Sequence, residues 1–143
     1  MKILLTGADS LLGHALALRL LEAGHQVFAF VSTGREIAHL QLLHLPVLWG
    51  DSGSAKDLAG AMDGMDAVFA LHDYDALYPK ARFPFFHQGK DTTGALLKAC
   101  HQTRVDRLIY ASSVFALPPA KGQVAQNMPH LKGPLLALSL IHI

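Results

Sequence analysis

Short apolar runs recur along the chain up to residue 111, and polar or amphipathic stretches separate them. A short run of mostly apolar residues bounded by turn residues is typical of a strand buried on both faces. The pattern therefore predicts five strands, at residues 2–5, 26–31, 46–49, 66–71 and 107–111.

The stretches between these runs predict helices. Residues 11–23 contain apolar residues at helical spacing, which predicts a helix with one apolar face. Gly24 stands where the C-terminal cap of this helix is expected. Ser54 is a typical N-cap for a helix that reaches Met62, with Asp57 near the positive end of its dipole. The remaining two helices are predicted at residues 35–43 and 85–103.

Strands that alternate with helices imply parallel βαβ units with right-handed crossovers. The fold class expected is therefore α/β, a doubly wound parallel sheet covered by helices on both faces. The expected strand order is 3-2-1-4-5, which places a ligand-binding crevice beside the first strand, where the strand order reverses.

The alternation stops after Ala116. Residues 117–133 are rich in Pro, Lys, Gly and Gln and predict an exposed loop, whereas residues 135–143 form an apolar run that lacks a following βα partner. We therefore interpret residues 1–119 as one domain and residues 120–143 as a loop and apolar tail, truncated or foreign. On this interpretation the chain stops before the sixth strand and the substrate lobe.

Composition narrows the function classes. The 143 residues carry a net charge of +1, which gives no electrostatic footprint for nucleic acid or an anionic membrane. The single cysteine, Cys100, excludes an internal disulfide and fits a cytoplasmic protein. The N-terminus lacks a signal-peptide core, and no apolar run reaches the roughly 18 residues that span a bilayer.

A glycine-containing turn joins the first strand to the first helix. Gly7 would form the tight turn, and Gly13 would let the helix pack closely on the strand. Ser10 stands where a second glycine normally admits a pyrophosphate, and its hydroxyl could donate to phosphate. The alternative is an ordinary strand–helix turn that binds nothing. The predicted cofactor-binding residues of this turn are Thr6, Gly7, Ser10, Leu11, Leu12 and Gly13.

Residues 6–13 resemble the T-G-x-x-G-x-x-G turn of the extended short-chain dehydrogenases, the NAD-dependent epimerase/dehydratase family. Residues 50–51 resemble the family's G-D end of the third strand, and residues 105–113 resemble its V-x-R-x-V-Y-x-S-S signature. The resemblance extends over residues 1–119 and is closest to the dihydroflavonol-reductase-like and hopanoid-associated sugar-epimerase-like branch. It implies a Rossmann fold, a small-molecule substrate and a homodimeric full-length protein.

The sequence departs from the family at two motifs. Ser10 replaces the central glycine of the turn, and Gly89 replaces a structural asparagine in the long helix. The family's N-V-x-G-T segment corresponds to residues 89–93 of this chain, and only Thr93 matches it.

The end of the second strand bears on the choice of nucleotide. NAD-binding proteins usually place an acid there to hold the ribose 2′-hydroxyl, and residues 31–35 contain none. Ser32 and Arg35 could instead hold a 2′-phosphate, so NADP(H) is favoured over NAD(H). The alternative is that Arg35 is only a solvated residue in the first turn of the second helix. By resemblance, Asp51 reaches the adenine.

Catalysis in the family uses a serine after the fifth strand and a Tyr-x-x-x-Lys pair. The resemblance assigns Ser113 to positioning the substrate oxygen and Ser112 to bracing the strand end beside the nicotinamide; the alternative for both is a turn whose hydroxyls satisfy backbone groups. None of the tyrosines has a lysine four residues later. The chain as given therefore lacks the general acid/base pair of the family.

Three hypotheses follow. The first is the NADP(H)-binding part of an oxidoreductase or epimerase acting on a secondary alcohol or ketone, such as a sugar nucleotide or a dihydroflavonol-like substrate. The second is a non-catalytic NADP(H)-binding or redox-sensing module, and the third is an inert fragment. No histidine or cysteine cluster predicts a metal site: His39 and His44 have the wrong spacing, and His72 is interpreted as a loop residue.

Overall fold

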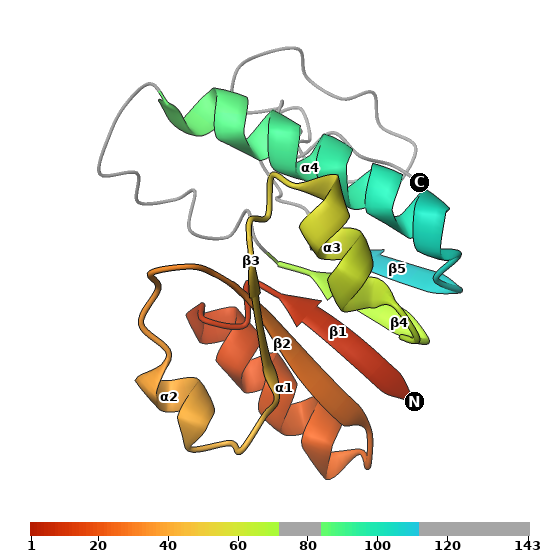
Figure 1. The fold of residues 1–143 in the computed structure, drawn as a ribbon. Helices are drawn as coiled ribbons and strands as arrows, with labels where there is room; N and C mark the ends of the chain where they lie inside the picture. Colours follow the sequence, from red (N-terminus) through yellow and green to blue (C-terminus); the bar gives the residue numbers. More distant parts are fainter. Residues whose placement is uncertain (72–83, 112–143) are drawn as a thin grey trace, which may run out of the picture.

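The computed structural model describes residues 1–71 and 84–111, with side chains placed for residues 1–71 and 92–111. Five parallel strands form one sheet in the order β3-β2-β1-β4-β5, which confirms the predicted fold class and strand order (Figure 1). The strands are β1 (Lys2–Thr6), β2 (Gln26–Ser32), β3 (Val47–Gly50), β4 (Ala67–Ala70) and β5 (Arg107–Tyr110).

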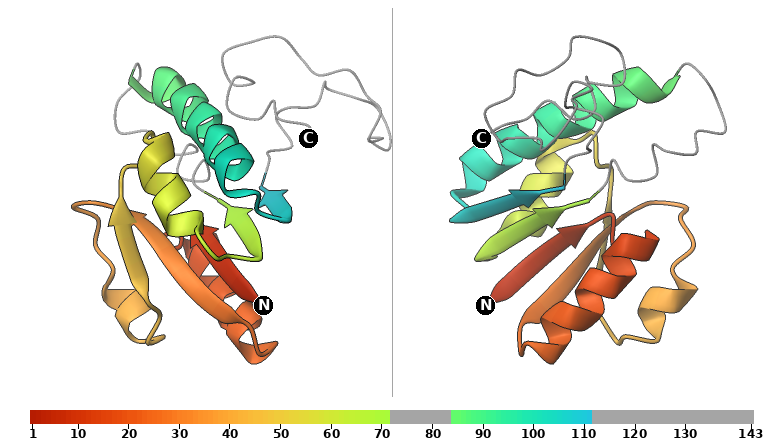
Figure 2. Two further views of the ribbon diagram at one scale, coloured as in Figure 1. Left: turned by 45° about the vertical axis from the view of Figure 1, so that its right-hand side comes forward. Right: turned by 180° about the vertical axis from the view of Figure 1, so that it is seen from behind.

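Helices cover both faces of this sheet, as the doubly wound prediction requires. They are α1 (Leu11–Glu22), α2 (Ala38–Gln41), α3 (Ala55–Met62) and α4 (Pro84–Thr103). Figure 2 shows α1 and α2 on one face of the sheet and α3 and α4 on the other. The chain moves outward in one direction from β1 to β3, then returns to start β4 on the other side of β1.

The pairing register aligns the carboxyl ends of the central strands. Thr6, the last residue of β1, lies beside Phe30 of β2 and Ala70 of β4. Ser32, the last residue of β2, lies beside Gly50 at the end of β3. The loops that leave these strands therefore start along one edge of the sheet, with the switch in strand order at β1.

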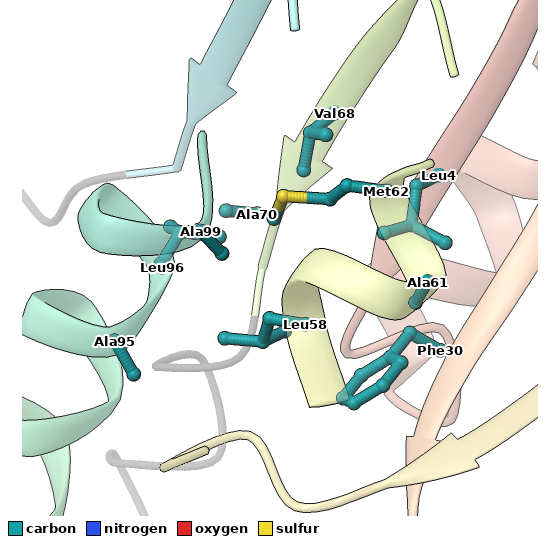
Figure 3. Close-up of a cluster of buried hydrophobic side chains, with 10 residues drawn as sticks. All are labelled: Leu4, Phe30, Leu58, Ala61, Met62, Val68, Ala70, Ala95, Leu96 and Ala99. Carbon is teal, nitrogen blue, oxygen red and sulfur yellow. The ribbon is translucent and has the colours of Figure 1, made fainter. Parts of the chain in front are cut away.

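Two hydrophobic clusters hold the helices against the sheet, because successive strand residues point to opposite faces. Leu4 belongs to the cluster beneath α3 and α4, and Leu5 to the cluster beneath α1 and α2. Figure 3 shows the first cluster, where the Phe30 ring packs below α3 and Leu96 reaches in from α4. Cys100 of α4 packs at the margin of this cluster.

The predicted caps of α1 and α3 are confirmed. Gly24 has a φ of 78°, and the amides of Gly24 and His25 donate to the carbonyls of Leu21 and Leu20 at the end of α1. Ser54 precedes α3 and its hydroxyl oxygen accepts from the Asp57 amide at 3.2 Å. Both helices therefore end or begin where local side-chain and backbone chemistry dictates.

The second helix was predicted at the wrong length. Residues 35–43 were expected to be helical, but α2 is a single turn, Ala38–Gln41. Gly34, with a φ of 88°, belongs to the turn that the Arg35 amide closes by donating to the Ser32 carbonyl at 3.2 Å. Ile37 provides no side-chain cap for α2. Arg35 therefore lies in the β2–α2 loop rather than in the first turn of a helix.

Among the residues that the structure describes, no helix is long and apolar enough to cross a membrane. The proposed loop and tail at residues 120–143 lie outside the described residues.

Candidate nucleotide-binding site

The β1–α1 turn is built on a close backbone contact. Gly7 adopts a φ of 67°, a left-handed conformation that glycine tolerates best. A Cβ atom added to Gly13 would lie 2.2 Å from the Gly7 carbonyl oxygen and 2.7 Å from the Ala8 Cα. Only glycine fits at position 13, so the first turn of α1 can fold directly onto the turn that follows β1.

Ser10 holds this turn together. Its hydroxyl oxygen accepts from the Gly13 amide at 3.0 Å, and its hydroxyl donates to the Gly7 carbonyl at 2.8 Å. The Ser10 amide donates to the same carbonyl at 3.1 Å. Ser10 is thus the N-cap of α1. In this geometry the hydroxyl proton that was expected to reach a phosphate goes to the backbone instead.

The first turn of α1 still presents two backbone donors. The amides of Leu11 and Leu12 have no acceptor inside the helix, because the first turn of any α-helix lacks one. Leu11 is 89% exposed and Leu12 is 37% exposed, so the first turn of α1 lies at the surface. No acidic residue occupies this first turn. The helix therefore directs two N–H groups and the positive end of its dipole toward solvent, as an anion-binding terminus requires.

An ion pair joins the two loops on either side of this terminus. The Arg35 Nε donates to the Asp9 Oδ2 at 2.5 Å, between residues that are 26 positions apart in the sequence. The Asp9 side chain is 10% exposed and the Arg35 side chain is 50% exposed. Arg35 is therefore drawn from the β2–α2 loop toward the β1–α1 turn. Sequence reasoning missed Asp9, because it occupies a variable position of the turn motif.

Asp51 lies at the end of β3, on the same edge of the sheet. Its Oδ1 accepts from the Gly53 amide at 2.8 Å, and its own amide donates to the Asp57 Oδ2 at 2.9 Å. Gly50, before it, lies so close to the Phe30 ring that an added Cβ would be 2.9 Å away. Asp51 is exposed, and its amide is held by Asp57 of α3. It directly follows β3 and so lies at the edge of the sheet where it was expected.

The catalytic prediction falls beyond the described residues. Ser112 and Ser113 follow Ala111, whose amide donates to the Ala70 carbonyl at 2.9 Å, but they lie outside the described part of the chain. Tyr110 ends β5, and its hydroxyl oxygen lies 3.5 Å from the hydroxyl oxygen of Thr93 in α4. Thr93, which matches the family motif, thus contacts the strand that leads to the predicted serines.

Cys100 packs against core side chains of the described residues. Burial raises the pKa of its thiol above the ordinary value, and its Sγ lies 3.9 Å from the Met62 Sδ. A neutral thiol beside a thioether favours a core role for Cys100 over that of a nucleophile.

The described residues contain no group of three or more potential metal ligands. His39 does have a neighbour that its sequence position does not suggest: its ring centroid is 5.4 Å from that of His14, at an interplanar angle of 65°. His14 belongs to α1 and His39 to α2, and these two helices cover the same face of the sheet. His44 lies beyond α2, in a left-handed conformation with a φ of 52°.

Comparison with known proteins places the chain in a family. A family model described as NAD(P)H-binding matches residues 7–138. A 2-alkyl-3-oxoalkanoate reductase of Stenotrophomonas maltophilia is 32% identical over 135 residues, which cover 91% of this chain and 40% of the relative.

Solved structures share the fold. A nucleoside-diphosphate-sugar epimerase from Pseudomonas aeruginosa superposes with a TM-score of 0.72 at 23% identity, over 96% of this chain and 44% of the other. A UDP-glucuronic acid 4-epimerase from Bacillus cereus, solved in complex with NAD, has a TM-score of 0.77 at 23% identity, over 98% and 49% of the two chains. The chain thus spans less than half the length of these relatives. Because the family model extends from the first glycine of the turn through the last strand of the sheet, the chain belongs to the NAD(P)H-binding family.

Proposed function

We propose that this chain binds NADP(H) in preference to NAD(H) and forms the nucleotide-binding part of an oxidoreductase or epimerase. The observation that carries the proposal is the α1 N-terminus at the switch point, where two amides without helical acceptors stand beside a glycine turn. A pyrophosphate is the anion that such a turn accommodates in doubly wound sheets.

Some residues of the turn would contact the nucleotide, and others would hold the turn in shape. The amides of Leu11 and Leu12 would donate to the pyrophosphate, and Gly7 would form the tight turn that precedes them. Gly13 and Ser10 would act indirectly, because their contacts with Gly7 hold the turn in shape.

The adenosine end would lie over the ends of β2 and β3. Arg35 is half-exposed in the β2–α2 loop, so its guanidinium is accessible to a 2′-phosphate, and Ser32 ends the same strand. Asp51 stands at the next strand end, which suits a contact with adenine. Thr6 is buried at the end of β1 and would support the turn from beneath.

We further propose that the complete protein acts on a secondary alcohol or ketone, with a nicotinamide supplying the hydride chemistry when bound. The names of its relatives, an oxoalkanoate reductase and nucleotide-sugar epimerases, both fit this reaction class. Ser113 would position the substrate oxygen and Ser112 would brace the strand end. Because the 143 residues contain no Tyr-x-x-x-Lys pair, we expect the chain alone to bind nucleotide without turnover.

The departures from the family motifs at Ser10 and Gly89 favour a second candidate, a non-catalytic NADP(H)-binding or redox-sensing module. The two functions share the binding site and differ in the residues that accompany it. Single-turnover measurements with a panel of ketones on the full-length protein distinguish them, since only the enzyme would oxidise bound NADPH.

The binding proposal is tested by titrating the folded chain with NADPH and NADH while following energy transfer from Trp49, the sole tryptophan. We expect saturable transfer and a lower Kd for NADPH. Arg35→Ala should weaken NADPH binding about tenfold and leave NADH binding nearly unchanged, because only NADPH carries the 2′-phosphate that the guanidinium would bind.

Arg19→Ala is the matched control. Arg19 is an exposed arginine near the end of α1, paired only locally with Glu22 at 2.9 Å. The Arg19→Ala substitution removes the same charge as Arg35→Ala and should alter neither the NADPH Kd nor the NADH Kd. Tighter NADH binding by the unaltered chain would overturn the NADP(H) preference, and the absence of binding by a folded chain would overturn the proposal itself.

A further inference from the structure

We propose that Asp9 is a specificity-determining residue that replaces the acid missing from the end of β2, so that the Asp9–Arg35 pair limits the preference for NADP(H) over NAD(H). This inference rests on the proposed nucleotide-binding function. It concerns a residue outside the glycine positions of the turn motif, and its basis is the ion pair between the β1–α1 turn and the β2–α2 loop.

The position of the Asp9 carboxylate is set by its surroundings. Asp9 follows Ala8, which is fully buried, and precedes Ser10, which caps α1. Its side chain is only 10% exposed, and its Oδ2 accepts from the Arg35 Nε. Because Gly13 locks this turn, the carboxylate is a fixed feature at the switch point, whereas the half-exposed Arg35 is the adaptable partner.

The location of this carboxylate matters for the ribose. In NAD-binding sheets of this type, an acid at the end of β2 accepts from the ribose 2′-hydroxyl. Here β2 ends in Ser32, and the nearby loop contributes Arg35. The ion pair holds the β2–α2 loop against the Asp9 carboxylate, so the neighbouring turn supplies an acceptor that the sequence of β2 lacks.

The same carboxylate opposes a 2′-phosphate. A phosphate monoester carries about −1.5 to −2 charges near neutral pH. It would be attracted to Arg35 but repelled by Asp9, whose charge neutralises that of the guanidinium. Asp9 therefore favours the hydroxyl of NAD(H), Arg35 favours the phosphate of NADP(H), and the balance between them fixes the selectivity.

Asp9→Asn tests this balance, because it keeps the shape of the side chain and removes its charge. We expect the NADPH Kd to fall and the NADH Kd to rise, each by roughly threefold to tenfold, as the loss of one partly buried charge contact implies. The opposite movement of the two constants is a readout that a merely structural role of Asp9 would not produce. Glu22→Gln, an equal charge change on the exposed far end of α1, should move neither constant.

A double variant separates the two actions of Asp9. In an Arg35→Ala background, Asp9→Asn should still weaken NADH binding, because the carboxylate contact with the ribose does not need the arginine. Circular dichroism confirms that each variant is folded. An unchanged ratio of the two Kd values in Asp9→Asn would overturn the inference while sparing the proposed function. If the folded unaltered chain binds neither nucleotide, both are overturned.

Discussion

The N-termini of α1 and α3 look alike in sequence and differ in what they leave available. Each follows a strand and begins with a serine N-cap whose hydroxyl oxygen accepts from the amide three residues later. In α3 that third residue is Asp57, whose carboxylate also accepts from the Asp51 amide. In α1 it is Gly13, and the first turn contains no acid.

This difference explains why one terminus suits an external anion and the other does not. Asp57 places a negative charge at the positive end of α3, so that end is already compensated. At α1 the first turn contains no acid, the preceding Asp9 carboxylate is paired with Arg35, and Gly13 brings the helix onto the Gly7 carbonyl. The same serine cap thus precedes a first turn with an acid in α3 and a first turn without one in α1.

The largest effect is expected from Gly13→Ala. The added Cβ would lie 2.2 Å from the Gly7 carbonyl oxygen, so the turn must open. Overpacking of this kind costs roughly 1–3 kcal/mol of the free energy of unfolding, and we expect NADPH binding to be lost with it. Gly60→Ala in α3 is the matched control: nothing lies within 4 Å of its added Cβ.

Gly60→Ala should raise the free energy of unfolding by about 0.5–1 kcal/mol, since alanine is the better helix former. Urea denaturation compares the two glycine variants directly. Equal stability of Gly13→Ala and the unaltered chain would show that the close approach in the β1–α1 turn is unimportant.

A second variant gives α1 the charge that α3 already has. Leu11→Asp places an acid in the first turn of α1, at a residue that is 89% exposed and so has little packing to lose. The acid should stabilise the helix by about 0.3–1 kcal/mol and weaken binding of both nucleotides about tenfold, because it competes with the pyrophosphate. Leu11→Asn is the neutral control, and a Leu11→Asp variant that binds NADPH as tightly as Leu11→Asn would contradict the comparison.

The smallest difference is expected between the two serine caps. Ser10→Ala and Ser54→Ala should each lower the free energy of unfolding by about 1 kcal/mol, the usual cost of a lost N-cap. Only Ser10→Ala should also raise the NADPH Kd, by roughly threefold, because its hydroxyl additionally holds the Gly7 carbonyl. Parallel thermal unfolding and titration of the two variants measure both effects, and equal Kd values would remove the special role given to Ser10.

Much of this architecture was predictable from local pattern. The five strands, their order and the caps at Gly24 and Ser54 depend on short apolar runs and on single residues with strong conformational preferences. The turn at Gly7 was predictable for the same reason. The length of α2 was not, because the turn at Gly34 consumes residues whose helical pattern suggested a longer helix.

The charges of the site were harder to predict than its backbone. The Asp9–Arg35 pair joins two loops 26 residues apart, and no periodicity along the chain indicates it. The end of β2 contains no acid, and the carboxylate that pairs with Arg35 comes instead from the turn after β1. In the same way, the contact between His14 and His39 arises only when α1 and α2 pack on one face.

The most direct test of the account is an NMR titration of the ¹⁵N-labelled chain with NADPH, observing the first-turn amides of both helices in one experiment. The account predicts saturable downfield shifts of the Leu11 and Leu12 amide protons, as expected for new hydrogen bonds to a pyrophosphate, without such shifts at Ala55 and Lys56 of α3. Saturation of NADPH binding with the Leu11 and Leu12 resonances unmoved would contradict it.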